Sequence, residues 1–197
     1  MELFASTSAV LPTVPRLILV MVLGGIFVYF PGAGSRTFAS SGTDDDVGVV
    51  WAQFSFMVTG ALATIWQGLL VPIRLYNGLA AISILACSLA LYEWARHVVW
   101  GRKFYIAWSG SVPDALCDQG PYAYIRHPIY ASYILAFLAV LVALPTLLTL
   151  AAFVFNVGLF THAALSDERS LATGTFGADY ARYKKRTGMF LPRLVRR

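Results

Sequence analysis

Residues 129–165 read IYASYILAFLAVLVALPTLLTLAAFVFNVGLFTHAAL, a stretch without Asp, Glu, Lys or Arg that Pro145 divides into two apolar runs. A helix needs about 20 apolar residues to cross a bilayer core about 30 Å thick, and both runs approach that length. Proline cannot continue a helix interior, because it lacks an N–H and its ring clashes with the preceding turn. The stretch therefore predicts two membrane-spanning helices joined in a tight hairpin.

The chain as a whole has the same apolar character. Of its 197 residues, 58% are hydrophobic and 13% are charged, and the mean hydropathy is +0.66. One soluble core of this size cannot bury so much apolar surface, so a soluble globular enzyme is disfavoured. We expect an all-α fold: a single integral membrane bundle of about five transmembrane helices over residues 1–197. The expected spans are residues 15–30, 48–71, 75–97, 129–144 and 146–165.

The first span has an alternative reading as a cleaved signal peptide, because small residues follow it around Ala39 and Ser40. The residues before the apolar run include Glu2 and no basic residue until Arg16. A signal peptide needs a positively charged start. We therefore favour a retained span.

Basic residues are concentrated in two stretches. The loop over residues 96–128 and the tail after residue 165 hold twelve of the fifteen Lys and Arg residues. Short basic loops stay on the cytoplasmic side of a membrane. We therefore expect a cytosolic C-terminus, an outside N-terminus and location in the bacterial inner (plasma) membrane. The basic residues are separated by apolar segments, so membrane lipids are expected partners and nucleic acid is not.

The loop before the fourth span, residues 114–130, reads DALCDQGPYAYIRHPIY. Gly120-Pro121 favours a turn, and Pro128 suits the first position of a helix, where its missing N–H costs nothing. The fourth span should therefore begin at Pro128, with His127 extended just before it. The positive end of such a helix can bind an anionic group.

Aromatic and basic side chains surround this predicted helix start. Tyr122, Tyr124 and Tyr130 could stack on a heteroaromatic ring and hydrogen-bond to it. In the alternative interpretation, Arg126 and His127 are membrane-surface anchors, and the tyrosines form an interfacial aromatic belt. The loop by itself does not decide between the two.

An acidic pair, Asp167-Glu168, follows the fifth span, and the predicted hairpin brings it beside the start of the fourth. Carboxylates at the C-terminal end of a helix oppose the helix dipole, so helix stability does not explain them. The pair is a candidate for the same polar site. The alternative is solvated charge beyond the membrane.

The tail has a helical pattern, since Phe176, Tyr180 and Tyr183 recur at i, i+4 and i+7. The opposite side carries Arg182, Lys185 and Arg186. This pattern predicts a helix lying on an anionic leaflet. Its aromatic face could instead close over a cofactor.

The two cysteines carry no recognisable chemistry. Cys87 lies in an apolar span and Cys117 in the loop before the fourth span. Two cysteines make no disulfide framework, and their spacing is not that of metal ligands. We predict no metal site.

Three motifs follow one another in order: Gly-Pro-Tyr-x-x-x-Arg-His-Pro-x-Tyr over 120–130, a helical hairpin with an acidic pair, and Phe-Gly-x-x-Tyr-x-x-Tyr-Lys-Lys-Arg over 176–186. This order resembles the isoprenylcysteine carboxyl methyltransferase and phospholipid methyltransferase superfamily of integral membrane enzymes. The resemblance covers residues 114–192 and implies a methyltransferase-like module that binds S-adenosyl-L-methionine near the cytosolic membrane surface. It implies catalytic roles for Glu168, His127 and Arg126. The implied cofactor contacts are Leu116, Cys117, Gly120, Tyr122, His127, Pro128, Ile129, Tyr130 and Glu168.

The chain departs from the superfamily pattern at two places. The superfamily begins its motif with His-x-Leu-Val, where this chain has Asp114-Ala-Leu-Cys117, so one polar contact is altered. Isoprenylcysteine enzymes also carry an arginine one turn before the glutamate, where this chain has Ala164, with His162 as the nearest basic side chain. An acceptor carboxylate needs a fixed cation. We therefore expect a lipophilic acceptor other than a prenylcysteine carboxylate.

Two other function classes stay open. A similar C-terminal module occurs in NADPH-dependent membrane reductases related to sterol reductases, which are much longer chains. A non-enzymatic membrane binding protein is the third hypothesis. The sequence assigns no oligomeric state.

Overall fold

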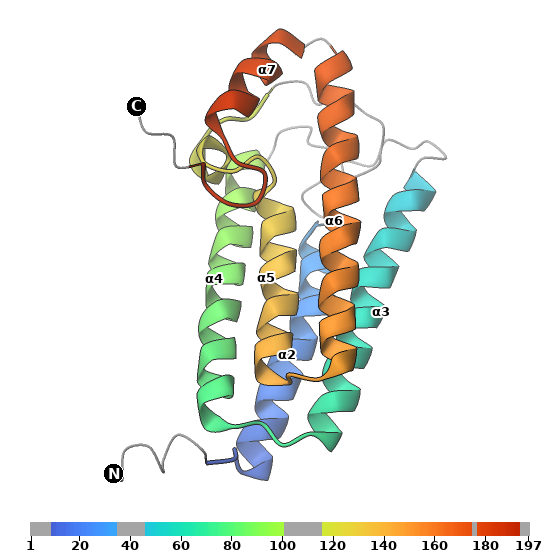
Figure 1. Cartoon of the computed structure of the whole chain (residues 1–197), viewed down its shortest axis with the longest axis vertical. Helices are drawn as coiled ribbons and strands as arrows, with labels where there is room; N and C mark the ends of the chain where they lie inside the picture. Colours follow the sequence, from blue (N-terminus) through green and yellow to red (C-terminus); the bar gives the residue numbers. More distant parts are fainter. Residues whose placement is uncertain (1–8, 35–45, 101–115, 175–176, 194–197) are drawn as a thin grey trace.

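The computed structural model describes residues 9–34, 46–100, 116–174 and 177–193, and most of them are helical. Five long helices run alongside one another, and a shorter one covers an end of the bundle (Figure 1). The elements are α2 (Thr13–Gly34), α3 (Asp46–Leu70), α4 (Leu75–Val99), the 3-10 turn η1 (Gly120–Ala123), α5 (Pro128–Ala143), α6 (Leu147–Thr173) and α7 (Gly177–Arg186). The predicted all-α membrane bundle is confirmed.

Three of the described helices are long and apolar enough to cross a membrane: Thr13–Ala33 within α2, Leu75–Val99 and Leu147–Thr173. Met57–Leu70 and Pro128–Ala143 are shorter apolar stretches. The chain is therefore an integral membrane protein. The 16 residues of α5 make about 24 Å of helix, less than a bilayer core of about 30 Å.

The turn between α5 and α6 satisfies its own polar groups. The Oγ1 of Thr146 accepts a hydrogen bond from the N–H of Thr149 at 3.2 Å, and the Oγ1 of Thr149 accepts one from the N–H of Thr146 at 3.1 Å. Such reciprocal capping matters where lipid offers no hydrogen bonds. The predicted hairpin is confirmed, and the last turns of α6 lie beside the first turn of α5 (Figure 1).

Helix α6 continues to Thr173, about two turns past the predicted end at residue 165. The prediction stopped where apolar residues stop, but the polar residues that follow are compatible with a helix. The helix ends only before Gly174. Asp167 and Glu168 therefore lie within α6, where a rigid element fixes their directions, and not directly after the span as predicted.

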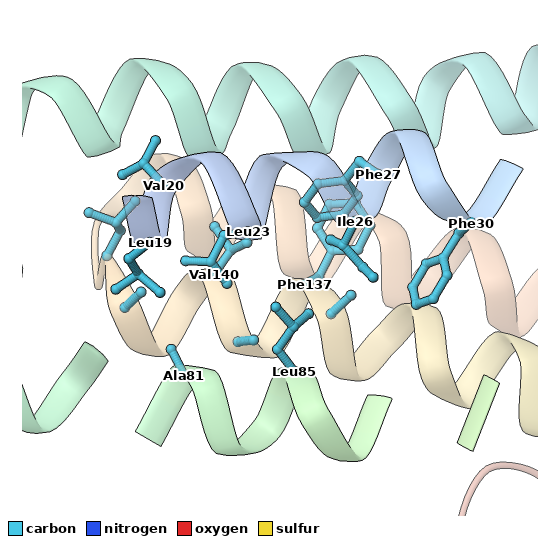
Figure 2. Packing of buried hydrophobic residues seen from close by; sticks show 14 of the residues in the cluster. Leu19, Val20, Leu23, Ile26, Phe27, Phe30, Ala81, Leu85, Phe137 and Val140 are labelled. Carbon is cyan, nitrogen blue, oxygen red and sulfur yellow. The ribbon is translucent and has the colours of Figure 1, made fainter. Parts of the chain in front are cut away.

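Helix α2 packs its apolar residues against α3, α4 and α5 (Figure 2). The ring of Phe27 lies 4.8 Å from that of Phe137, centroid to centroid. Between helices in lipid, close packing provides the stabilisation, because lipid tails are as apolar as the side chains. The buried α2 residues are Leu19, Val20, Leu23, Ile26, Phe27 and Phe30.

The two ends of the bundle are different. At one end, the N–H of Leu11 donates to the carbonyl of Ile73 at 2.8 Å, so the segment before α2 pairs with the turn between α3 and α4. The other end holds η1, the start of α5, the end of α6 and α7 (Figure 1). Arg74 thus lies at the opposite end from the tail, as the predicted order of spans requires.

Two glycines of α3 allow α2 to approach closely. A Cβ at Gly60 would lie 2.3 Å from the Phe27 ring, and one at Gly68 would lie 2.3 Å from Val20 Cγ2, whereas a Cβ at Gly25 meets nothing within 4 Å. We expect Gly60→Ala and Gly68→Ala to lower the free energy of unfolding by about 1–3 kcal/mol through overpacking. Gly25→Ala should leave it unchanged or raise it by up to about 1 kcal/mol through helix propensity. Thermal unfolding in detergent measures the difference, and equal melting temperatures for the three variants would contradict this packing.

Candidate functional site

The loop after α4 returns onto the end of that helix through η1. Gly120 has φ +57°, and a Cβ there would lie 2.6 Å from Val98 Cγ2. Glycine is therefore needed for both backbone conformation and space. The turn buries Cys117 and Tyr122 against the end of α4.

A short backbone pairing joins this loop to the tail. The N–H of Arg126 donates to the carbonyl of Gly188 at 2.8 Å, and the N–H of His127 donates to that of Met189 at 3.1 Å. The N–H of Gly188 donates to the carbonyl of Tyr124 at 3.2 Å. Helix α5 then begins at Pro128, as predicted. The start of α5 is thus fixed to residues that follow α7.

Glu168 is the centre of the polar cluster at this end. Its side chain is 3% exposed, and its Oε1 accepts a hydrogen bond from Arg126 Nε at 2.7 Å. Lys184 Nζ lies 2.6 Å from Oε2, and His127 Nε2 lies 3.5 Å from Oε1. A buried carboxylate is tolerated only when paired, and the positive charges of Arg126 and Lys184 favour its ionised form.

Arg126 connects three segments. Besides its bond to Glu168, its Nη1 donates to the carbonyl of Thr187 at 2.5 Å and lies 3.4 Å from that of Lys184. The guanidinium is 8% exposed, so these partners replace its hydration. Arg126, predicted to be catalytic, is in this structure the link between α6, the loop and the tail.

Asp167 is tied to the same helix start. Tyr130 donates its hydroxyl to Asp167 Oδ2 at 2.8 Å. The ring of His127 stacks on that of Tyr130 at 5.5 Å and an angle of 5°, and Tyr130 stacks in turn on Phe160 at 5.8 Å. Both members of the acidic pair therefore contact the His-Pro motif, as the hairpin predicted.

Helix α7 turns its aromatic face toward the protein. Tyr180 and Tyr183 are buried, and the hydroxyl of Tyr183 donates to the carbonyl of Tyr122 at 2.7 Å. Burial, and secondarily the charge of Glu168, raises the pKa of Tyr180, and burial raises those of Tyr122 and Tyr183. The predicted packing of this face on the membrane surface is wrong. The pairing of residues 188–189 with the loop sets the direction of α7 and brings the rings over the site.

The outer side of α7 borders a polar groove of about 500 Å³. Arg186 crosses it to Asp118 at 3.4 Å, and Arg182 pairs with Asp179. The groove is lined by Leu116, Asp118, Asp179, Arg182 and Arg186. Of the predicted cofactor contacts, Leu116 therefore lies on this side of α7.

The predicted site residues form two neighbouring groups. One surrounds Glu168 and contains Arg126, His127 and Tyr130; the other lies against α4 and contains Cys117, Gly120 and Tyr122. Pro128 is buried at the start of α5, and Ile129 packs against the second group. Tyr183 connects the groups through its bond to Tyr122. Asp114 and Ala115 lie outside the described residues.

The sequence analysis missed Lys184 and the role of Tyr180. Both belong to the face of α7 that is directed at Glu168, since they are four residues apart. The four-residue spacing of Tyr180 and Lys184 in the sequence could have shown that the two share a helix face. The sequence analysis counts Lys184 only among the basic residues of the tail after residue 165.

Several buried polar atoms of this cluster lack a hydrogen bond. Among the described residues, His127 Nε2, Glu168 Oε2 and the Tyr180 hydroxyl are buried without a hydrogen bond of regular geometry, although Lys184 lies close to Oε2 and Glu168 lies close to His127. Buried polar atoms are normally paired, so these atoms are the candidates in this cluster for contact with a ligand. No group of three His, Cys, Asp or Glu side chains suited to a metal ion occurs among the residues that the structure describes.

The chain matches one family model. Residues 98–173 match that of the isoprenylcysteine carboxyl methyltransferase (ICMT) family. No curated protein matches the chain. The matched segment contains η1, α5, α6 and four residues of the cluster: Arg126, His127, Tyr130 and Glu168. The resemblance predicted from the motifs is confirmed, and it supports a membrane methyltransferase in general.

Proposed function

We propose that this chain is an S-adenosyl-L-methionine-dependent methyltransferase that acts on a lipophilic acceptor from the membrane. The observation that carries the proposal is the incomplete buried polar cluster around Glu168, which lies within the segment that matches the methyltransferase family. The cluster is at one end of a membrane bundle (Figure 1). A water-soluble cofactor and a lipid-soluble acceptor can both reach such a place.

The residues present suit this cofactor chemically. Glu168 Oε2, His127 Nε2 and the Tyr180 hydroxyl offer buried hydrogen-bonding atoms, and Tyr122 offers an aromatic face beside Cys117. When bound, S-adenosyl-L-methionine supplies an activated methyl group on a sulfonium. The chain has to bind and orient the two reactants and exclude water. Burial under α7 provides that exclusion.

His127 is the residue we assign to proton transfer. Its Nε2 is buried without a hydrogen bond, and the ring is held against Tyr130 at 5.5 Å. An amine, thiol or phenol acceptor loses a proton on methylation, and an imidazole nitrogen is suited to accept it near neutral pH. Glu168, 3.5 Å away at Oε1, stabilises the imidazolium that results.

Isothermal titration of the detergent-purified protein tests the proposal. We expect S-adenosylhomocysteine to bind and NADPH not to bind. Glu168→Gln removes the charge while keeping the shape, and loss of a charge-assisted hydrogen bond should weaken binding about ten- to a hundredfold. Glu93→Gln is the matched control, because Glu93 pairs with Arg96 and Tyr29 on α4 and α2, away from this cluster.

Three outcomes would count against the assignment. Binding of NADPH alone favours a reductase. Binding of neither compound favours a protein without this chemistry. If Glu168→Gln folds and binds S-adenosylhomocysteine as tightly as Glu93→Gln does, Glu168 is not part of the binding site.

The acceptor is argued from Ala164. It is fully buried and lies one turn before Glu168, so an arginine there would share the face of α6 that carries the site. Alanine offers neither charge nor hydrogen bond to an acceptor carboxylate. His162 is exposed, and Arg126 is committed to Glu168. An acceptor without a carboxylate, such as a phospholipid amine, a thiol or a phenol, fits this site better than a prenylcysteine.

We therefore expect labelled methyl transfer from S-adenosyl-L-methionine into a membrane lipid extract and little or none into N-acetyl-farnesylcysteine. The physical reason is the missing cation, since an acceptor carboxylate would be buried unpaired. Ala164→Arg is the complementary variant and should raise the prenylcysteine activity relative to the lipid activity. Efficient esterification of the prenylcysteine by the wild-type protein would show that the arginine is dispensable.

We also propose that the end with α7 faces the cytosol. It carries Arg126, Lys184 and most other basic residues, whereas Arg74 lies at the opposite end. Alkaline phosphatase, which needs an oxidising compartment, should be inactive when fused after Arg197 and active when inserted after Pro72. The reverse pattern of activity would show that the end with α7 faces away from the cytosol.

A further inference from the structure

The carboxylate of Glu168 is held by two cations that differ in character. Arg126 is 8% exposed, donates a directed hydrogen bond at 2.7 Å and is also bonded to the carbonyl of Thr187. Lys184 is 52% exposed. Its Nζ lies 2.6 Å from Oε2, so the two form a close ion pair whose cation remains half-exposed to water.

The two cations also differ in what their departure would cost. Withdrawal of Arg126 would leave a buried guanidinium unpaired and Glu168 with only a half-exposed partner, which is destabilising. The Lys184 side chain can move into water, where its ammonium is hydrated again. A half-exposed ion pair contributes little to stability, so the loss of this pair costs little free energy. Glu168 would then keep Arg126 as a partner. Oε2 would be open to another cation or N–H donor.

We infer that the ammonium of Lys184 occupies the position beside Glu168 Oε2 that a positively charged group of the cofactor takes when it binds. Helix α7 is then a lid, and the ion pair between Lys184 and Glu168 is its latch, which competes with the ligand. This inference rests on the proposed function. S-adenosyl-L-methionine carries an ammonium and a sulfonium, and either can pair with a carboxylate. The buried Tyr180 hydroxyl lies on the same face of α7 as Lys184, so movement of this helix uncovers both sides of the carboxylate.

The contacts that hold the segment after α7 do not depend on the Lys184 side chain. The segment after α7 is fixed by backbone bonds from Arg126 to Gly188 and from His127 to Met189, none of which involves Lys184. Along α7, the side-chain bond of Tyr183 to the carbonyl of Tyr122 is a second closing contact. Release of Lys184 therefore loosens α7 while the pairing at residues 188–189 keeps the tail attached to the loop.

The test compares Lys184→Met with Lys185→Met. Both lose one positive charge on neighbouring positions of α7, but Lys185 is exposed and has no ion pair among the described residues. Hydrogen exchange of residues 177–187 without ligand reports on the lid. Titration with S-adenosyl-L-methionine and with S-adenosylhomocysteine reports on the competition. Lys184→Arg, which keeps the charge, should behave as the wild type.

We expect Lys184→Met to exchange faster over α7 and to bind both compounds about two- to fivefold more tightly than the wild type, the size of a partly exposed ion pair. Lys185→Met should change neither quantity. Added salt should speed α7 exchange more in the wild type than in Lys184→Met, because the variant keeps the exposed Arg186–Asp118 pair but lacks the pair between Lys184 and Glu168. A gain confined to S-adenosyl-L-methionine identifies the sulfonium as the competing group, and an equal gain identifies the ammonium.

Two failures can be told apart. If the wild type binds and Lys184→Met binds equally or more weakly, or if its α7 exchanges as in Lys185→Met, the inference is overturned and Lys184 only positions Glu168. If neither the wild type nor Lys184→Met binds either compound, the proposed function itself is overturned.

Discussion

A carboxylate that is 3% exposed at the end of a membrane bundle stays charged only when cations are fixed against it, and Glu168 imposes this requirement on everything around it. One cation comes from the loop before α5 and the other from α7. The guanidinium of Arg126 is in turn held by carbonyls of the tail. The loop, α6 and the tail therefore assemble as one unit around a single charge.

The motif residues of the sequence act through this unit. Pro145 and the Thr146–Thr149 capping pair reverse the chain, and the reversal alone brings the end of α6 to the start of α5. Pro128 starts α5 and leaves His127 outside the helix, where its ring stacks on Tyr130. The same geometry lets Tyr130 reach Asp167. Local turn chemistry thus brings into contact groups that are about forty residues apart in the chain.

Much of this arrangement was predictable from residue types, and the exceptions have a common cause. A charge-free apolar stretch divided by a proline predicts the hairpin, and the His-Pro step predicts the helix start. The direction of α7 was not predictable, because it depends on backbone bonds between residues 124–127 and 188–189, which have no side-chain signature. Tyr180 and Tyr183 therefore suggested a lipid-facing helix, and Lys184 suggested a surface charge. The extension of α6 was missed for a related reason, since apolarity marks the span and not the helix.

The short helix α5 has a consequence for the position of the site. With 16 residues it is about 13 Å shorter than the 25-residue α4 beside it. Contacts from α2, α4 and α6 enclose it: Ser88 on α4 donates to the carbonyl of Ser132 at 2.7 Å, and Phe27 on α2 packs on Phe137. Because α5 is shielded from lipid, its shortness needs no thinning of the bilayer, which would otherwise relieve the mismatch. The site at His127 and Glu168 lies at the N-terminal end of this enclosed helix, between the last turns of α6 and α7. On the proposed function, a lipophilic acceptor would approach this end of α5 laterally from the membrane, and α7 would cover the polar side of the site.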